Sequence, residues 1–430
     1  MNECLISEFS LHEGKTVTIK GWVANRRSSG KVSFLILRDG SGICQAIVER
    51  ETFAGPYEEI KKLPIESSVI ASGRVVGESR SPGGFELHVD VLDIVQKSEE
   101  FPIGKKEHGP DFLLNNRHLW LRSPRQIAIM RVRDALVRNV REFFHANNFT
   151  LIDTPIFTTT VGEDSSNLFS LDYFDLGRTF LSQTGQLYLE AAIFGLGKVF
   201  CLGPTFRAER SKTRRHLTEF WMVEGEMAFF EHKDNLELQE NFVTYIVQNT
   251  IREMADELTK LERDIEPLKK VAPPFYRVSY DEALEILHKE GSDIQWGSDL
   301  GGDDETIITN LFDKPVFIEN YPKKVKAFYM KQHPERPDCV LCADLLAPEG
   351  YGEIIGGSQR EDNYDILLKS ILEQKLDPER YGWYLDLRKY GSVPHSGFGL
   401  GIERTLSWIC GLKHVRETIP FPRMLYRAYP

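Results

Sequence analysis

Long hydrophobic runs are missing from this 430-residue sequence. A membrane-spanning helix needs about 18 consecutive apolar residues, and no segment comes close to that length, so we expect no membrane partner. The N-terminal stretch MNECLISEFSLHEGK has acidic residues where a secretory signal would be basic and then apolar. These two absences favour a cytoplasmic protein.

Cysteine is also sparse. The six cysteines are scattered rather than paired in the manner of a disulfide framework, which favours a reducing compartment. Cys339 and Cys342 lie near His333, but a structural zinc site needs a second pair of Cys or His ligands at close spacing. The sequence has no such pair, so it disfavours a zinc site.

The chain has no net positive charge, but basic residues are concentrated in one segment. The chain has 64 acidic against 53 basic residues and a net charge of −11, which disfavours indiscriminate binding to nucleic acid. Residues 207–216, by contrast, contain five Lys or Arg against one acid, Glu209. This segment is either a solvated charged turn or a place where phosphate groups bind.

The first hundred residues predict a small all-β unit. Five β-branched or alternating runs are separated by Gly-containing turns, and a short helix is expected at 52–63, after the third run. That arrangement is typical of the OB-fold, a five-stranded Greek-key barrel. We therefore predict an OB-fold domain at 1–98 and a charged, Pro- and Gly-containing linker at 99–115. The expected strands are 15–24, 33–38, 43–49, 69–77 and 85–96.

Residues 116–430 predict a larger α+β domain. Strands predominate and helices are interspersed irregularly, which is not the pattern of a doubly wound parallel sheet. Two apolar runs flank the basic turn and predict an antiparallel hairpin. The other expected elements are a helix at 124–146 with Ser123 as its cap and Pro124 first, a strand at 149–153, a long helix at 232–262, and a glycine-rich strand that leads into a helix at Glu403.

The side chains of the predicted hairpin favour a nucleotide ligand. Strand residues alternate between faces, so Arg207 and Glu209 share one face of the first strand, and Phe220 and Glu224 share one face of the second. A guanidinium can hold a phosphate through two hydrogen bonds, a ring can stack on a base, and a carboxylate can accept from an exocyclic amine. The alternative is an exposed sheet face with salt bridges across it.

Three glycines in HSGFGLGIER fall on one face of a predicted strand: Gly397, Gly399 and Gly401. Glycine weakens a strand, so this face predicts a flat ligand such as adenine packed on bare backbone, with Arg404 near its phosphates. The pattern is not the dinucleotide GxGxxG, and no phosphate-binding GK[ST] occurs. A plain core strand would have Val or Ile on both faces.

Two further acids, Asp344 and Glu353, lie in or next to apolar strand-like sequence. Carboxylate oxygens in such positions suit Mg²⁺. The alternative is that they are two unconnected surface acids.

Together these segments resemble the three motifs of class II aminoacyl-tRNA synthetases. The resemblance rests on the helix and strand ending at Pro155, on FRAE and RHLTEF in the hairpin, and on GFGLGIER near the C-terminus. The N-terminal barrel resembles the anticodon-binding domain of the aspartyl/asparaginyl/lysyl subgroup. For residues 116–430 the resemblance implies a class II catalytic domain, which is built on an antiparallel sheet flanked by helices. Within the subgroup, HLTEFWMVE, GEIIGGSQRED and ETIPFPR are most similar to the asparaginyl enzymes.

The resemblance implies a two-step reaction with ATP and Mg²⁺. L-asparagine and ATP give asparaginyl-adenylate and pyrophosphate, and the asparaginyl group then passes to the terminal adenosine of tRNA(Asn). The implied roles are Arg207 at the α-phosphate and the substrate carboxylate, Phe220 and Glu209 at adenine, His216 and Arg404 at the γ-phosphate, Asp344 and Glu353 at Mg²⁺, and Glu163 and Gln186 in the amino-acid pocket. Arg210, Lys212 and Arg214, in the turn, are left free to meet tRNA phosphates.

Selection of asparagine over aspartate has to be electrostatic, because the two are nearly isosteric. The resemblance implies that Arg360 faces the side-chain oxygen common to both. Aspartyl enzymes carry Ser-Pro and a lysine where this chain has Thr184-Gly185 and Leu189. Glu224 would accept from the asparagine amide and repel aspartate. The alternative is that Glu224 only pairs with Arg360 and orients it.

Other functions stay open at this stage. They are an aspartyl enzyme, with or without strict tRNA selection, a paralogue that makes free asparagine, and a catalytically inactive RNA-binding or regulatory protein. The resemblance also implies a homodimer formed through the helix 124–146 and the strand before Pro155. In the barrel, Arg27, Phe34 and Gln45 have the spacing of residues that contact an anticodon base, by stacking and hydrogen bonding.

Overall fold

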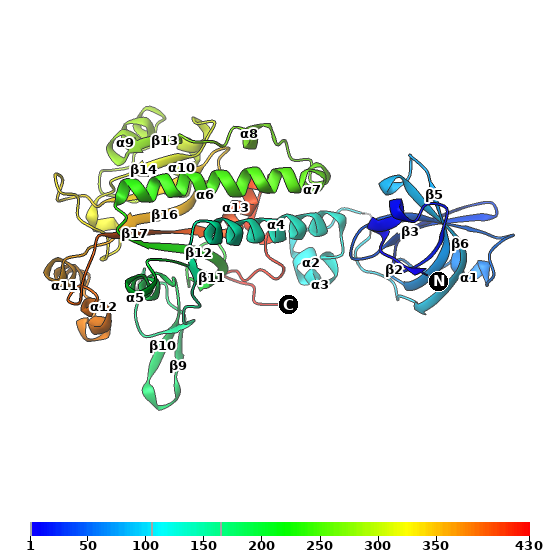
Figure 1. Cartoon of the computed structure of the whole chain (residues 1–430), viewed down its shortest axis with the longest axis horizontal. Helices are drawn as coiled ribbons and strands as arrows, with labels where there is room; N and C mark the ends of the chain where they lie inside the picture. Colours follow the sequence, from blue (N-terminus) through cyan, green and yellow to red (C-terminus); the bar gives the residue numbers. More distant parts are fainter. Residues whose placement is uncertain (1, 105, 164–165) are drawn as a thin grey trace. The chain divides into compact units, whose positions relative to one another are not determined.

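A computed structural model describes residues 2–104, 106–163 and 166–430. The chain forms two compact units, Met1–Leu113 and Leu114–Pro430, and each contains its own sheet (Figure 1). The helix α2 lies within the predicted linker 99–115 and is one of the elements between the two sheets. Its bounds are Pro110–Asn115.

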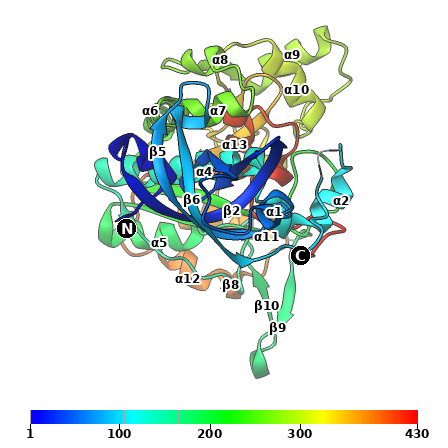
Figure 2. The ribbon, with the colours of Figure 1, turned by 90° about the vertical axis from the view of Figure 1, so that its right-hand side faces the viewer.

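The first unit is the predicted five-stranded barrel. Its strands run in the order β2-β3-β4-β6-β5, and β5 pairs back with β2, which closes the ring. In Figure 2 β2, β5 and β6 curve around a common interior. A sixth, two-residue strand, β1, pairs in parallel with β2 and was not predicted. The elements are β1 Asn2–Glu3, β2 Thr16–Ser29, β3 Val32–Arg38, β4 Ile43–Glu49, α1 Tyr57–Lys61, β5 Ser68–Gly77 and β6 Phe85–Gln96.

Alternation of side chains fills the barrel. Along β3, for example, Leu35 and Leu37 are buried while Phe34 and Ile36 lie on the partly exposed outer face. Gly73 permits the closest strand approach, because a Cβ at this position would collide with the backbone of His88 on β6. The pairing register of β5 with β6 shifts at this glycine, as expected where a barrel strand bends.

The second unit is built on an eight-stranded sheet of order β13-β14-β15-β16-β17-β12-β11-β7. The six central strands pair antiparallel, as predicted. The edge strands β7 and β13 pair parallel with their neighbours, so the sheet is mixed. The strands are β7 Thr150–Leu151, β11 Lys198–Phe206, β12 Glu219–Ala228, β13 Tyr276–Ser279, β14 Val316–Glu319, β15 Cys342–Ala347, β16 Gly352–Gln359 and β17 His395–Gly401.

Two long helices, α4 and α6, lie side by side along this sheet (Figure 1). α4 spans the predicted residues, and Ser123 caps it by accepting from the Gln126 backbone at 3.4 Å. The rings of Phe143 and Phe242, 5.0 Å apart, join the two helices in the main core. The predicted helix 232–262 is divided in two at Met254. The helices here are α4 Pro124–Ala146, α6 His232–Glu253, α7 Ala255–Lys260 and α13 Ile402–Cys410.

Smaller elements surround the sheet. The predicted strand 149–153 is reduced to β7, and a three-stranded sheet of order β8-β10-β9 was not predicted. No helix in the described part of the chain is long and apolar enough to cross a bilayer. The remaining elements are α3 Arg117–Trp120, β8 Phe157–Thr158, β9 Ser170–Asp172, β10 Arg178–Leu181, α5 Gln186–Leu196, α8 Glu266–Lys269, α9 Tyr280–Lys289, α10 Gly302–Asn310, α11 Tyr364–Glu373 and α12 Gly382–Asp386.

Candidate active site and anticodon surface

A cavity of about 300 Å³ lies over the central strands β12, β16 and β17. All thirteen site residues that the sequence predicts for the second unit line this one cavity. They are Glu163, Gln186, Arg207, Glu209, His216, Phe220, Glu224, Asp344, Glu353, Arg360, Gly399, Gly401 and Arg404.

Arg207 is the cation with the fewest fixed contacts in the cavity. β11 ends at Phe206, so the expectation that Arg207 lies within a strand is wrong; it follows the strand directly. Its guanidinium lies 5.5 Å from the ring centre of Phe220, and its buried Nε has no hydrogen-bond partner among the described residues. Burial would lower the pKa of Arg207, but nearby carboxylates, Glu163 first, raise it above its ordinary value. The side chain therefore stays charged and can accept an anion.

The basic turn is divided between residues that face the cavity and residues that face solvent. His216 Nε2 lies 3.2 Å from Glu209, and burial together with Arg404 lowers the pKa of His216. Arg215, which the sequence analysis did not single out, is also in the cavity wall and pairs with Glu305 at 3.0 Å. The remaining cations of the turn are exposed, namely Arg210, Lys212 and Arg214.

The glycines of strand β17 have two different roles, one in lining the cavity and one in making room for an acid. Gly399 and Gly401 line the cavity, as predicted. Gly397 does not: β17 pairs it with Glu226 of β12, and a Cβ there would collide with the Glu226 carboxylate. The expectation that a flat ligand covers all three glycines is therefore wrong at Gly397, where the missing side chain makes room for an acid.

The carboxylates of Asp344 and Glu353 lie close together in the cavity wall. Both carboxylates lie against Gly356, at 3.6 Å and 3.2 Å from the position that its Cβ would take. Burial, together with the charge of Glu353, raises the pKa of Asp344 to about 6, although Lys326 opposes this shift. Burial acts to raise the pKa of Glu353, but Arg404, Lys326 and Arg207 together outweigh it and hold this pKa below its usual range. Two adjacent carboxylates of this kind fit a magnesium ion.

Several residues of the cavity were missed by the sequence analysis. Lys326 Nζ is 2.7 Å from Asp344 and 3.3 Å from Asp299. The Tyr329 hydroxyl donates to Glu163 at 2.9 Å. Both residues lie in the segment KVKAFYM (324–330), which begins within the 3-10 helix η4 Lys323–Val325 and precedes β15. No motif marks them there. Only the position of a lysine and a tyrosine within an apolar stretch could have drawn attention to them.

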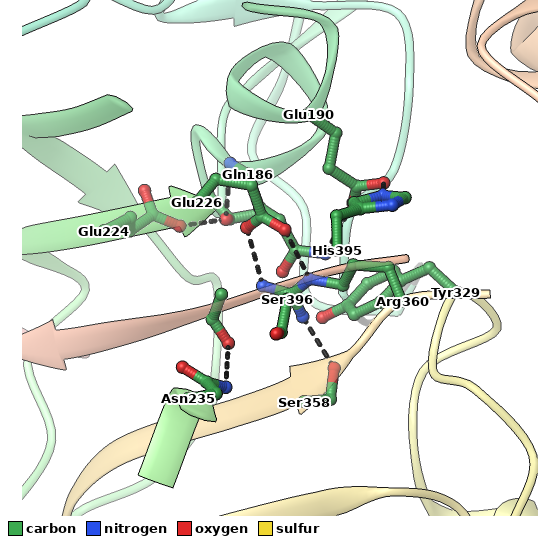
Figure 3. Close-up of polar contacts among 12 residues, drawn as sticks. Gln186, Glu190, Glu224, Glu226, Asn235, Tyr329, Ser358, Arg360, His395 and Ser396 are labelled. Atoms are coloured by element: carbon green, nitrogen blue, oxygen red, sulfur yellow. Dashed lines mark hydrogen bonds and ion pairs between the residues drawn. The ribbon is translucent and has the colours of Figure 1, made fainter. Parts of the chain in front are cut away.

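Glu224 is held at the inner end of the cavity. It is 4% exposed, and its carboxylate accepts from the Gly185 backbone N–H at 2.7 Å, from the Thr184 hydroxyl, and from the Cys201 thiol at 3.5 Å. Burial raises the pKa of Glu224, and these hydrogen bonds oppose the rise. In Figure 3 Glu224 lies apart from Arg360, and no dashed line joins the two side chains.

Arg360 pairs with Glu226, not with Glu224. Its Nε and Nη2 donate to the two Glu226 oxygens at 2.9 Å each, and its Nη1 donates to Ser358 at 2.7 Å (Figure 3). The alternative in which Glu224 only orients Arg360 is therefore wrong. Both members of the pair are almost fully buried, at 3% and 1% exposure, so Arg360 is fixed in place.

A second buried ion pair lies behind this one. Glu190 accepts from Arg388 at 2.8 Å, from His395 Nε2 at 3.0 Å and from the side-chain amide of Gln186 at 3.0 Å. Oxygens and a ring nitrogen of Glu190, Glu226 and His395 lie within 4.8 Å of one another, but two guanidiniums already compensate the two carboxylates. The cluster is a buried ion-pair layer that includes Arg360 and contacts Gln186.

The predicted barrel residues also come together. Arg27 of β2 and Phe34 of β3 are cross-strand partners, and the guanidinium lies 4.4 Å above the ring. Arg27 also donates to Gln45 of β4 at 3.3 Å, and Gln45 donates to Glu86 at 2.8 Å. Arg27 is exposed and the other two predicted residues are half-buried, so the three form one accessible patch with a ring and polar groups.

The comparisons with known proteins agree with this geometry. Residues 109–425 match the family described as tRNA synthetases class II (D, K and N), and residues 17–95 match the OB-fold nucleic acid binding domain. The chain belongs to the class II tRNA synthetases.

The individual relatives are similar over almost the whole chain. An asparagine–tRNA ligase of Pelotomaculum thermopropionicum is 53% identical over 432 residues and covers 100% of both chains. One from Roseiflexus sp. (strain RS-1) is 52% identical and covers 99% of this chain and 98% of its own. The crystal structure of the Pyrococcus horikoshii asparaginyl-tRNA synthetase with asparaginyl-adenylate is 49% identical, with a TM-score of 0.95 over 98% and 97% of the two chains.

Proposed function

We propose that this protein is an ATP-dependent asparagine–tRNA ligase. The observation that carries the proposal is the cavity, which is lined by a charged Arg207 and by a buried Glu224. Among the residues that the structure describes, Nε of Arg207 has no hydrogen-bond partner. An anion fits at Arg207 and an amide donor at Glu224. Similarity to asparagine–tRNA ligases over the full chain supports this choice.

In the first step the carboxylate of asparagine attacks the α-phosphorus of ATP. A C–O–P bond forms, the bond from phosphorus to the bridging oxygen breaks, and pyrophosphate leaves. Both reactants are anions, so the barrier falls through cations placed where charge develops. Arg207 would contact the α-phosphate and the carboxylate, with Arg404 and His216 near the γ-phosphate. Phe220, Glu209 and the bare backbone at Gly399 and Gly401 would hold adenine.

Asp344 and Glu353 would hold Mg²⁺. When bound, the ion would neutralise the phosphates of ATP and the leaving pyrophosphate. In the chain alone Lys326 and Arg404 compensate these two carboxylates, so binding of the ion requires both cations to share their partners.

In the second step a ribose hydroxyl of the terminal adenosine of tRNA(Asn) attacks the carbonyl carbon of the adenylate, and AMP leaves. The exposed cations of the basic turn would meet the acceptor-end phosphates, because each neutralised phosphate releases counterions. The barrel patch of Arg27, Phe34 and Gln45 would stack on and hydrogen-bond an anticodon base.

Asparagine, rather than aspartate, is the substrate that fits the inner end of the cavity. Arg360 would donate to the side-chain oxygen, which both amino acids have. Glu224 would accept from the amide nitrogen, which only asparagine has, and would repel a second carboxylate. Leu189, where aspartyl enzymes have a lysine, adds no compensating cation. An aspartyl enzyme is therefore the weaker candidate.

We also propose that the protein acts as a homodimer in the cytoplasm. β7 is the edge of the eight-stranded sheet, and three apolar side chains near it are 40%, 42% and 51% exposed: Leu151, Ile156 and Phe157. An unpaired edge with apolar neighbours suits a twofold contact with a second copy.

Pyrophosphate exchange into ATP tests the proposed function. The measurement is made with asparagine and with aspartate side by side, followed by charging of tRNA(Asn) and tRNA(Asp). Exchange that depends on asparagine and charging of tRNA(Asn) are expected. Exchange with aspartate alone would favour the aspartyl enzyme, and no exchange with either amino acid would favour an inactive RNA-binding protein.

A further inference from the structure

The hydrogen bonds around Glu224 have a definite direction. The Gln186 backbone N–H donates to the Thr184 hydroxyl oxygen at 3.0 Å. The hydroxyl proton of Thr184 is therefore left for Glu224. The Gly185 N–H and the Cys201 thiol also donate to this carboxylate. Each of these groups offers Glu224 a proton, so the arrangement favours the ionised carboxylate over the neutral acid.

The number of donors matters as well as their direction. An ionised carboxylate has about four acceptor positions, and three are filled from within the chain. The remaining position belongs to a group that lines the cavity and is 4% exposed. A substrate amide N–H can fill it, whereas a substrate carboxylate has no proton to offer.

We propose that Thr184 and Gly185 are positioning residues for amino-acid selection, because they hold Glu224 as a carboxylate with one acceptor position facing the cavity. This inference rests on the proposed function. It assigns the selection of an amide over a carboxylate to the turn that precedes α5 as well as to Glu224 itself.

Burial explains why such support is needed. A carboxylate without partners in a nearly dry site tends to take up a proton. Burial does raise the pKa of Glu224, as does the nearby charge of Glu163, whereas Thr184, Gly185 and Cys201 lower it. With fewer donors Glu224 would spend more time as the neutral acid, which can donate to aspartate.

Proline at position 185 removes the N–H, and alanine provides a matched control. A Cβ at Gly185 lies 2.6 Å from the Thr154 hydroxyl and 3.0 Å from the Cys201 sulfur, so both substitutions bring this crowding. Gly185→Pro alone loses the donor, and its ring also occupies the backbone nitrogen. A second pair of variants tests the hydroxyl donor of Thr184. Thr184→Val removes the hydroxyl, and Thr184→Ser keeps it.

The test measures kcat/KM for asparagine and for aspartate in pyrophosphate exchange, together with KM for ATP and the melting temperature. Loss of a hydrogen bond to a charged group changes a ratio of rate or binding constants by about tenfold. We expect the asparagine-to-aspartate ratio to fall about tenfold in Gly185→Pro relative to Gly185→Ala, and in Thr184→Val relative to Thr184→Ser, with KM for ATP unchanged.

Equal ratios within both pairs would overturn the inference, because crowding alone would then explain any loss. If Gly185→Pro does not fold, the Thr184 pair decides. Absence of asparagine-dependent exchange in the unmodified protein would instead remove the proposed function, so the two failures are distinguishable.

Discussion

The two ends of the cavity differ in how their charges are compensated. At the amino-acid end Arg360 and Arg388 each have a carboxylate partner and are almost completely buried. At the opposite end the buried Nε of Arg207 has no partner among the described residues, and Arg404 and Glu353 form a pair that is 27% and 38% exposed. The amino-acid end therefore has its charges paired within the chain, although Nη1 of Arg388 also has no partner among the described residues, and the opposite end keeps charge available for a ligand.

This difference matches what each end has to distinguish. Asparagine and aspartate differ by one polar group, so their separation requires donors and acceptors that are fixed in advance. A triphosphate and a metal ion bring several charges of their own, and charged groups with weaker internal bonds can rearrange around them. We therefore expect a large loss of turnover when the end near Arg207 is changed. At the amino-acid end we expect losses of both stability and selectivity.

The largest effect is expected for Arg207→Ala. Its guanidinium is proposed to meet charge that grows in the transition state, so kcat for adenylate formation should fall about 10³-fold or more, with little change in melting temperature because few internal bonds are lost. Pyrophosphate exchange measures this. Near-normal exchange would remove Arg207 from the ATP site; Arg404→Ala should behave similarly but with a clearer loss of ATP affinity.

Arg360→Ala should damage the amino-acid end in two ways. Exchange should fall for asparagine and aspartate alike, because the oxygen that Arg360 faces is common to both. Glu226 would also be left buried and unpaired, which costs about 3–5 kcal/mol of unfolding free energy. Denaturant unfolding measures the second loss.

The matched control for that substitution is Lys269→Ala, which breaks the exposed pair with Glu266 and should cost less than about 1 kcal/mol. Similar costs for the two substitutions would contradict the paired, buried character of the amino-acid end.

Phe34→Ala should weaken tRNA charging by about 1–3 kcal/mol through loss of stacking. Adenylate formation without tRNA should not change, because Phe34 belongs to the barrel and lies outside the cavity. The two assays are run on the same preparation. An equal loss in both would indicate a folding defect rather than an anticodon contact.

The smallest effect is a pH dependence of selection. Burial places the pKa of Glu224 above its ordinary value, so lowering the pH protonates it earlier than an exposed acid, while substrate aspartate stays ionised. The aspartate-to-asparagine ratio of exchange rates should therefore rise as the pH is lowered across the range in which the enzyme is active. The ratio should not respond to pH in Glu224→Gln. A flat ratio in the unmodified protein would mean that Glu224 does not change charge in this range.

Much of this architecture was predictable because it depends on local pattern. The cap at Ser123 and the apolar spacing that follows it determine α4, and alternation determines the barrel strands. Thirteen residues of the cavity were predictable from motifs, whereas Lys326 and Tyr329 were not, because no motif marks them. Short elements such as β7 were not, since two residues carry no usable period and depend on their neighbour β11.

The pairing of acids with Arg360 shows where sequence reasoning ends. Glu224 and Glu226 share a strand face, and alternation alone cannot distinguish them. The register of three strands does: Ser358, Gly397 and Glu226 lie in one row, and Gly356, Gly399 and Glu224 in the next. Arg360 lies two residues beyond Ser358. Its side chain therefore reaches Glu226 across the space left by Gly397. Register between distant segments is a tertiary property.

The central claim is that Glu224 distinguishes an amide from a carboxylate. The most direct measurement is the ratio of kcat/KM for asparagine to that for aspartate in pyrophosphate exchange by Glu224→Gln. The account predicts a fall of about tenfold or more, because the repelling charge is gone and a carboxamide can donate to aspartate. An unchanged ratio would contradict it, and with it the preference for asparagine over aspartate as the substrate.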